Sequence, residues 1–337
     1  MKNCLWISLV FTTLSYSEAQ RSLLPPVGPT SLRQIVRAYF TIPEGRSSSL
    51  NDIRILHFTN STEPTGTYRL GSVRKILSDP GFDPDKPTVL YAHGYVEFTT
   101  DDSVRTIVKA YEQNGGYNIL ILDWSNIAFG DYTLVSLGVQ SAGAEIAKAM
   151  VRLVRGGLSR EGLHFVGHSM GVHLLGAAAR DMAAAGIKVP RLTGLDVAYP
   201  GFYPPVLGKA ASPADAQFVD MIHTDGGGYG APHALGHADF WPNGGIAKQP
   251  GCVSATIFLT SEDFCSHWRS WGYWAEAVAG SSFWSRQCDD YDAFLRGLCA
   301  DNPPVRLGPA SGTEIRGNFY LRTAATVPYS LGKRGAE

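Results

Sequence analysis

The chain has 337 residues with a formal net charge of −1, and 44% of its residues are hydrophobic. This charge balance gives no electrostatic basis for binding nucleic acid, and no basic run points to an anionic membrane surface. The composition fits a globular protein with one sizeable core, and we expect a single domain over residues 20–337.

Residues 1–19 have the pattern of a cleaved signal peptide. Lys2 supplies the positive charge, Cys4–Leu14 supplies a short apolar stretch, and small residues at Ser17 and Ala19 precede the expected cut. The alternative is a buried N-terminal helix. The apolar stretch is too short to cross a membrane, and no second segment is apolar for long enough. We therefore expect an exported protein without a transmembrane anchor.

Short apolar runs alternate with segments of helical spacing along the rest of the chain. Strands are expected at Ile35–Ile42, Thr88–Ala92, Tyr117–Leu122, Leu163–Val166, Arg191–Leu195 and Phe218–Ile222. Helices are expected at Ser103–Gln113, Ala142–Leu153 and Val172–Ala185, and Gly- and Pro-rich residues 225–251 are expected to form long loops. This alternation predicts a doubly wound, mostly parallel sheet with helices on both faces, with ligands bound beyond the carboxyl ends of the strands.

A possible nucleophile lies at the junction of an expected strand and helix. Residues 167–171 read GHSMG, follow an apolar run and open a helix, which is the context of a nucleophile elbow with Ser169 at its tip. Gly167 and Gly171 flank the serine because side chains there would collide with the neighbouring strand and helix. The alternative is a chance pentapeptide in a Gly-rich chain.

A serine hydroxyl is a weak nucleophile without a base, so an acid and a histidine should follow along the chain. We predict Asp196 as the acid because it ends the apolar run Arg191–Leu195. The rival acids are Asp215, Asp220 and Asp225, of which Asp220 has the pattern of a structural acid. His267 is the candidate base, with His223, His233 and His237 as rivals.

Acyl transfer also needs two backbone amides that donate to the developing oxyanion. One belongs to the residue after the nucleophile, which is Met170, and the other comes from an early strand-end loop. Tyr95 is predicted to supply the second amide, because Gly94 lets its loop approach closely. The role expected for His93 is to brace this loop.

Four cysteines remain after the signal peptide: Cys252, Cys265, Cys288 and Cys299. An even count in an exported chain favours two disulfides, with three pairings open, whereas a zinc site would favour closer spacing. The sequon at Asn60 is a candidate for glycosylation.

Several long motifs occur in one order along the chain. They are HGY at His93, LDWS at Leu122, GHSMG at Gly167, TGLD at Thr193, FVDMIHTDGG at Phe218, GHADFWPNGG at Gly236, QPGC at Gln249, CSHWRS at Cys265 and GNFYLRT at Gly317. With these motifs the chain resembles the pancreatic lipase family from about residue 37 to 332. The similarity is to its short single-domain form, found among arthropod lipases and venom phospholipases A1.

This resemblance implies an α/β-hydrolase fold without a C-terminal β-sandwich domain. It also implies His267 as the base, a structural His223, and the disulfides Cys252–Cys265 and Cys288–Cys299. The chain departs from the family by having Val197 after the acid, where proline is frequent. It also lacks most oxygen ligands of the calcium site that some relatives have, so no metal is predicted. No cofactor is expected.

The resemblance implies a secreted serine ester hydrolase that acts on triacylglycerol or phospholipid at a membrane, micelle or droplet interface. Residues Cys252 to Cys265 would form a short disulfide-closed lid, which favours phospholipid, although an ordinary stapled loop is the alternative. Two other functions remain open. One is a non-catalytic lipid-binding or storage protein, and the other is a soluble carboxylesterase or acyltransferase.

Overall fold

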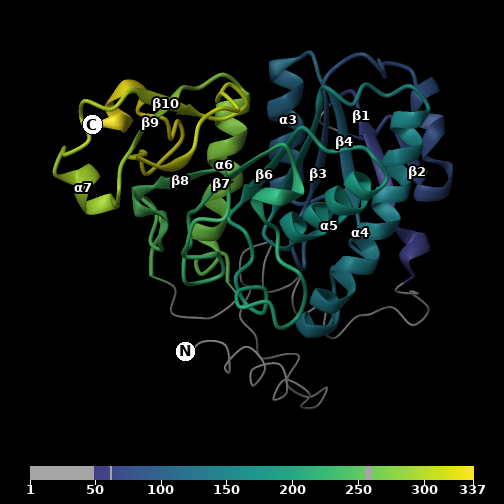
Figure 1. The fold of residues 1–337 in the computed structure, drawn as a ribbon, viewed down its shortest axis with the longest axis horizontal. Helices are drawn as coiled ribbons and strands as arrows, with labels where there is room; N and C mark the ends of the chain where they lie inside the picture. The colour runs from purple at the N-terminus through teal and green to yellow at the C-terminus, as the bar shows by residue number, and fades with distance from the viewer. Residues whose placement is uncertain (1–48, 61–62, 255–259) are drawn as a thin grey trace.

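The computed structural model describes residues 49–60, 63–254 and 260–337. Within these residues every named strand belongs to one eleven-stranded sheet (Figure 1). The strands are β1 (Arg54–Phe58), β2 (Gly66–Arg69), β3 (Thr88–Ala92), β4 (Asn118–Asp123), β5 (Leu163–His168), β6 (Arg191–Leu195), β7 (Phe218–Ile222), β8 (Ala238–Pro242), β9 (Phe283–Gln287), β10 (Pro304–Leu307) and β11 (Gly317–Leu321). The predicted signal peptide and the predicted strand Ile35–Ile42 lie outside the described residues.

The spatial order of the strands is β10-β9-β11-β8-β7-β6-β5-β3-β4-β1-β2. All neighbours from β11 to β4 are parallel, whereas β1 and β2 at one edge and β9 and β10 at the other run antiparallel to the strands beside them. The sheet is therefore mostly parallel, as predicted, with an antiparallel strand pair at each edge.

Helices cover both faces of the sheet (Figure 1). The helices are α3 (Asp102–Asn114), α4 (Tyr132–Arg155), α5 (Met170–Ala184), α6 (Cys265–Val278) and α7 (Tyr291–Leu295), with 3-10 helices η2 (Leu50–Asp52), η3 (Leu70–Ser78), η4 (Pro213–Asp215), η5 (Asn243–Gly245) and η6 (Gly332–Ala336). Leu90 and Ala92 of β3 share one core cluster with α4, α5 and η3. Val89 and Tyr91 share the other with α3 and α6. This two-layered core confirms the α/β-hydrolase class.

Most expected elements are present, several with ends shifted by one or two residues. One helix begins much earlier than expected, and one stretch expected to form loops contains a strand. The helix expected from Ala142 begins at Tyr132, because the Asp131 side chain accepts the amide of Leu134 and caps the earlier turns. The stretch 225–251, expected to be all loop, contains β8 and η5. All five residues of β8 are buried between β7 and β11, so tertiary packing outweighs the Gly- and Pro-rich surroundings.

The C-terminal strands β9, β10 and β11 extend the same sheet. The described residues therefore contain no separate β-sandwich domain. A search of these residues for a helix of sufficient length and apolar character to cross a membrane finds none.

Candidate active site

The turn at Ser169 joins β5 to α5 at the carboxyl edge of the sheet. Ser169 has φ 54° and ψ −120°, a strained conformation for a residue with a side chain. Added Cβ atoms would lie 2.6 Å from the Val172 nitrogen at Gly167 and 2.4 Å from the Ala92 carbonyl oxygen at Gly171. Both contacts are too close for any other residue, so the expected collisions are confirmed. The turn has the geometry of a nucleophile elbow.

The predicted acid and base contact each other directly. Asp196 is fully buried, and its Oδ2 accepts a hydrogen bond from Nδ1 of His267 at 2.5 Å. Its Oδ1 accepts the amides of Thr224 at 2.7 Å and Asp225 at 3.0 Å. These bonds fix the carboxylate, orient the imidazole and leave Nε2 of His267 as the nitrogen that can take a proton.

The elbow is held beside this pair. The Ser169 amide donates to the carbonyl oxygen of Leu195 at 3.0 Å, which ties the elbow to the strand that ends at Asp196. The ring of His168 has its centroid 4.6 Å from that of His267. Ser169 follows β5, Asp196 follows β6 and His267 lies in α6, and the structure brings the three to one edge of the sheet.

Two rival acids have structural partners away from His267. Asp215 forms an ion pair with Arg180 at 2.7 Å, and Asp220 forms one with Arg191 at 2.6 Å. Asp220 is thus the structural acid that its pattern predicted.

The rival histidines are engaged elsewhere. His223 is fully buried with Nε2 2.8 Å from Asp239, which confirms its structural role. His237 accepts the Val219 amide through Nδ1 at 2.9 Å, and His233 is exposed. Among the four candidate bases, only His267 has its Nδ1 hydrogen-bonded to the strand-end acid Asp196.

Asp225, considered from the sequence only as a rival to Asp196, adds a second carboxyl group to the site. Burial raises its pKa from 3.8 to about 7, and the negative charge of Asp196 contributes to the rise. Atoms of Asp196, Asp225 and His267 lie within 4.8 Å of one another, a spacing that a metal ion could also use. The hydrogen bond between Nδ1 of His267 and Oδ2 of Asp196 already uses these two atoms. That the protein needs no metal stays a prediction.

The two amides predicted to receive the oxyanion belong to segments that adjoin Ser169. Met170 is the first residue of α5, where helix amides have no acceptor within the helix. Tyr95 follows Gly94, and a Cβ added to Gly94 would lie 3.1 Å from the Cβ of Ser169. This loop therefore lies against the elbow, as its predicted role requires.

A second motif braces that loop. The indole nitrogen of Trp124 donates to the carbonyl oxygen of His93 at 3.0 Å, and the Ser125 hydroxyl lies 3.3 Å from His93 Nε2. His93 Nδ1 lies 3.0 Å from the Gly94 carbonyl oxygen. Burial lowers the pKa of His93, which favours the neutral form of the ring. These contacts support the bracing role predicted for His93.

The structure contains both expected disulfides, Cys252–Cys265 and Cys288–Cys299, each with a Cα–Cα distance of 5.7 Å. The first closes its loop two residues before His267. Phe264, at the end of this loop, packs against Val96, as Tyr95 also does. Residues 255–259 of the predicted lid lie outside the described residues, so the lid itself stays a prediction.

The glycosylation candidate Asn60 is exposed just after β1, and Ser61 and Thr62 of its sequon lie outside the described residues. Its glycosylation stays a prediction.

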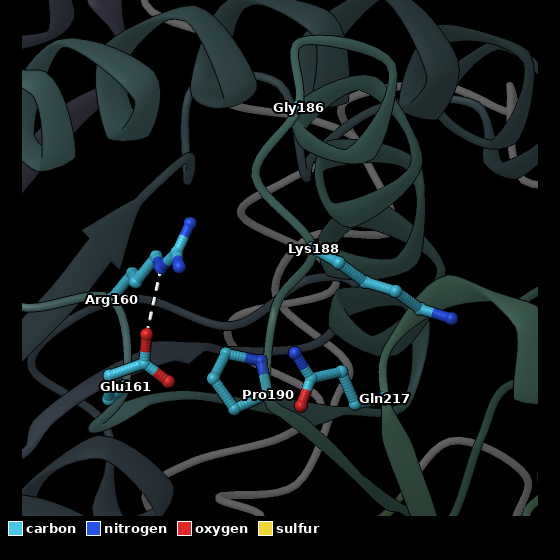
Figure 2. A pocket seen from close by; sticks show the side chains of 6 residues that line it. All are labelled: Arg160, Glu161, Gly186, Lys188, Pro190 and Gln217. Carbon is cyan, nitrogen blue, oxygen red and sulfur yellow. Dashed lines mark hydrogen bonds and ion pairs between the residues drawn. The ribbon is translucent and has the colours of Figure 1, made fainter.

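A small polar pocket lies away from these residues (Figure 2). Its lining residues are Arg160, Glu161, Gly186, Lys188, Pro190 and Gln217. Pro190 and Gln217 immediately precede β6 and β7, so this pocket lies at the amino ends of the strands. Ser169 and Asp196 follow the carboxyl ends, at the opposite edge of the sheet.

Comparisons with known proteins place the chain in a family. The family model described as Lipase matches residues 28–329. A pancreatic triacylglycerol lipase from Cavia porcellus is 31% identical over 313 residues, covering 84% of this chain and 66% of that protein. The chain belongs to the pancreatic lipase family. Pancreatic lipase-related protein 2 from Rattus norvegicus is 31% identical over 272 residues, covering 75% of this chain and 57% of that protein.

This family member spans about two thirds or less of the length of these curated relatives. Among solved structures, an esterase from Pyrobaculum calidifontis matches with a TM-score of 0.29 and 12% identity, covering 52% of this chain and 66% of that chain. This structural similarity is too low to locate functional residues, so the candidate site is assigned from the contacts described above.

Proposed function

We propose that the protein is a secreted serine hydrolase that cleaves lipid esters, with Ser169 as nucleophile, Asp196 as acid and His267 as base. The observation that carries this proposal is the 2.5 Å bond between Asp196 and His267, beside the strained elbow of Ser169. Membership of the pancreatic lipase family supports the substrate class, because matched relatives are named triacylglycerol lipases.

The proposed reaction is acyl transfer in two steps. His267 Nε2 takes the hydroxyl proton as Ser169 attacks the ester carbonyl, and it then gives this proton to the departing alcohol. Water, activated by the same imidazole, releases the fatty acid from Ser169. Asp196 holds the useful tautomer and stabilises the imidazolium that forms in each step.

Charge that develops on the carbonyl oxygen is received by the amides of Tyr95 and Met170. These amides are fixed before the reaction, because Met170 opens a helix and the Tyr95 loop is braced by neighbouring motifs. Pre-positioned donors in a site with little water are worth much more than donors in solution, and one of them supplies roughly 10²–10³ in turnover.

The covering loop supports a lipid interface as the place of action. Val253, next to Cys252, leaves 61% of its surface exposed, so an apolar side chain at this end of the loop is available to a lipid surface. The short loop between Cys252 and Cys265 favours phospholipid over triacylglycerol within the proposed lipid esters. Two disulfides and the predicted signal peptide at residues 1–19 favour an oxidising, extracellular compartment.

The purified protein should be assayed on triolein emulsion, on phosphatidylcholine vesicles and on monomeric short-chain ester, with Ser169→Ala as the control. Faster hydrolysis at either lipid surface than of the monomeric ester supports the proposal, and positional analysis of the products identifies the bond cleaved. Hydrolysis of the monomeric ester alone indicates a soluble carboxylesterase. Lipid binding without hydrolysis of any ester indicates a binding protein.

A further inference from the structure

One carboxylate oxygen joins the Tyr95 loop to the nucleophile elbow. Oε2 of Glu97 accepts the backbone amide of Gly94 at 2.5 Å and lies 3.1 Å from Nδ1 of His168. Gly94 precedes Tyr95, and His168 precedes Ser169. A single atom thus contacts the immediate neighbours of one oxyanion donor and of the nucleophile.

Glu97 is charged in this position. Its side chain is only 12% exposed, and burial opposes ionisation. The charge and hydrogen bond of His168, with contributions from His93 and the Gly94 amide, outweigh burial and lower the pKa of Glu97 to about 2. A carboxylate can only accept hydrogen bonds, so Nδ1 of His168 must be the donor.

The other nitrogen of His168 is the second unusual feature. Nε2 is buried and has no hydrogen-bond partner among the described residues. A buried polar atom without a partner costs about 1–3 kcal/mol, so a side chain chosen for stability alone would rarely be left in this state. The ring lies 44° from the plane of His267 with centroids 4.6 Å apart, so His168 contacts both Glu97 and the base.

We propose that Glu97 and His168 are a positioning pair that fixes the Tyr95 amide relative to Ser169. The pair touches neither substrate nor transferred proton. It acts by fastening the Gly94 end of the oxyanion loop to the elbow, so that donor and nucleophile keep one spacing during acyl transfer. This inference rests on the proposed function, because it assigns a task within the same site.

The test uses Glu97→Leu, which replaces the acceptor with an apolar side chain of similar volume, and Glu97→Gln, which keeps an acceptor but removes the charge. Exposed Glu112 on α3 provides the matched control Glu112→Gln. Turnover of p-nitrophenyl butyrate, a soluble ester, avoids effects on lipid binding. Melting temperatures establish that each variant is folded.

Glu97→Leu should lower kcat about 10- to 100-fold with KM changed less than about 3-fold, because misplacing a reacting group by ångströms costs rate more than binding. Glu97→Gln should lose less, because neutral hydrogen bonds are weaker than charge-assisted ones. Affinity for a trifluoromethyl ketone, which forms a tetrahedral oxyanion on the serine, should fall in parallel with kcat/KM.

A purely structural Glu97 would lower the melting temperature and leave kcat and inhibitor affinity of the folded variant unchanged, and that result overturns the proposal. If Glu97→Leu does not fold, a folded Glu97→Gln with the kcat of the parent overturns it equally. Failure of the proposed function is seen separately, because the parent itself would then neither hydrolyse ester nor bind the ketone covalently.

Discussion

Replacing Asp225 by Asn should stabilise the protein relative to the parent, by an amount that grows as the pH rises. Burial and the neighbouring Asp196 raise the pKa of Asp225 from 3.8 to about 7. The folded protein holds the proton of such a carboxyl group more tightly than the unfolded chain does. Once the pH rises above the raised pKa, this proton is lost, and the folded state is then destabilised relative to the unfolded chain. Asn carries no charge at any pH and can still accept the Tyr229 amide, which Oδ2 of Asp225 accepts at 3.0 Å.

The rise in pKa from 3.8 to about 7 corresponds to about 4 kcal/mol lost from the free energy of unfolding above pH 8. Roughly half of this loss falls between pH 5.5 and pH 9, so the stability of Asp225→Asn relative to the parent should grow by about 2 kcal/mol over that range.

Urea unfolding followed at pH 5.5, 7 and 9 measures this difference, with the exposed Asp301→Asn as control. The control tests whether loss of an exposed carboxylate gives the same change. A difference between Asp225→Asn and the parent that is flat with pH, or that shrinks as the pH rises, would refute the assignment of a raised pKa to Asp225.

Three further substitutions probe the site and its supports. Asp196→Asn keeps the shape of the side chain but removes the charge that stabilises imidazolium, so kcat on a soluble ester should fall roughly 10³–10⁴-fold while the protein stays folded; a loss below tenfold contradicts the role of Asp196. Gly171→Ala forces a Cβ to within 2.4 Å of the Ala92 carbonyl oxygen and should lower the free energy of unfolding, measured in urea, by at least about 1–3 kcal/mol. The control is Gly138→Ala on α4, where a Cβ meets nothing within 4 Å, and it should be neutral or stabilising. Removing the Cys252–Cys265 bridge with two serines should lower the free energy of unfolding by about 3 kcal/mol, since the bridge joins positions that are 13 apart in the sequence. Unchanged stability would show that the bridge constrains little.

Local sequence predicted the central strands well, because they are short apolar runs buried on both faces. The strands Thr88–Ala92, Arg191–Leu195 and Phe218–Ile222 have the predicted bounds. The strand Ala238–Pro242 was missed because its stability comes from pairing with β7 and β11, which local composition does not record.

The site, like the sheet, contains features that follow from local sequence and features that depend on long-range contacts. Ser169 and Asp196 were predicted from the elbow motif and the strand ends, whereas His267 was chosen among four histidines by the resemblance to a known family. The bond between Asp196 and His267 agrees with this choice. The contact between Glu97 and His168 could not be predicted, because it joins residues 71 positions apart and depends on how the loop folds back. Long-range contacts of this kind follow from packing rather than from local pattern.

The identity of the nucleophile tests the central claim most directly. The active protein should be treated with a fluorophosphonate, digested, and examined by mass spectrometry for the modified residue. The account predicts one adduct, on Ser169, with loss of ester hydrolysis in proportion to labelling and no adduct in His267→Ala at the same dose. The assignment of Ser169 as nucleophile would be contradicted if protein with the adduct on Ser169 kept full hydrolysis. It would also be contradicted if an adduct on a different serine abolished the activity.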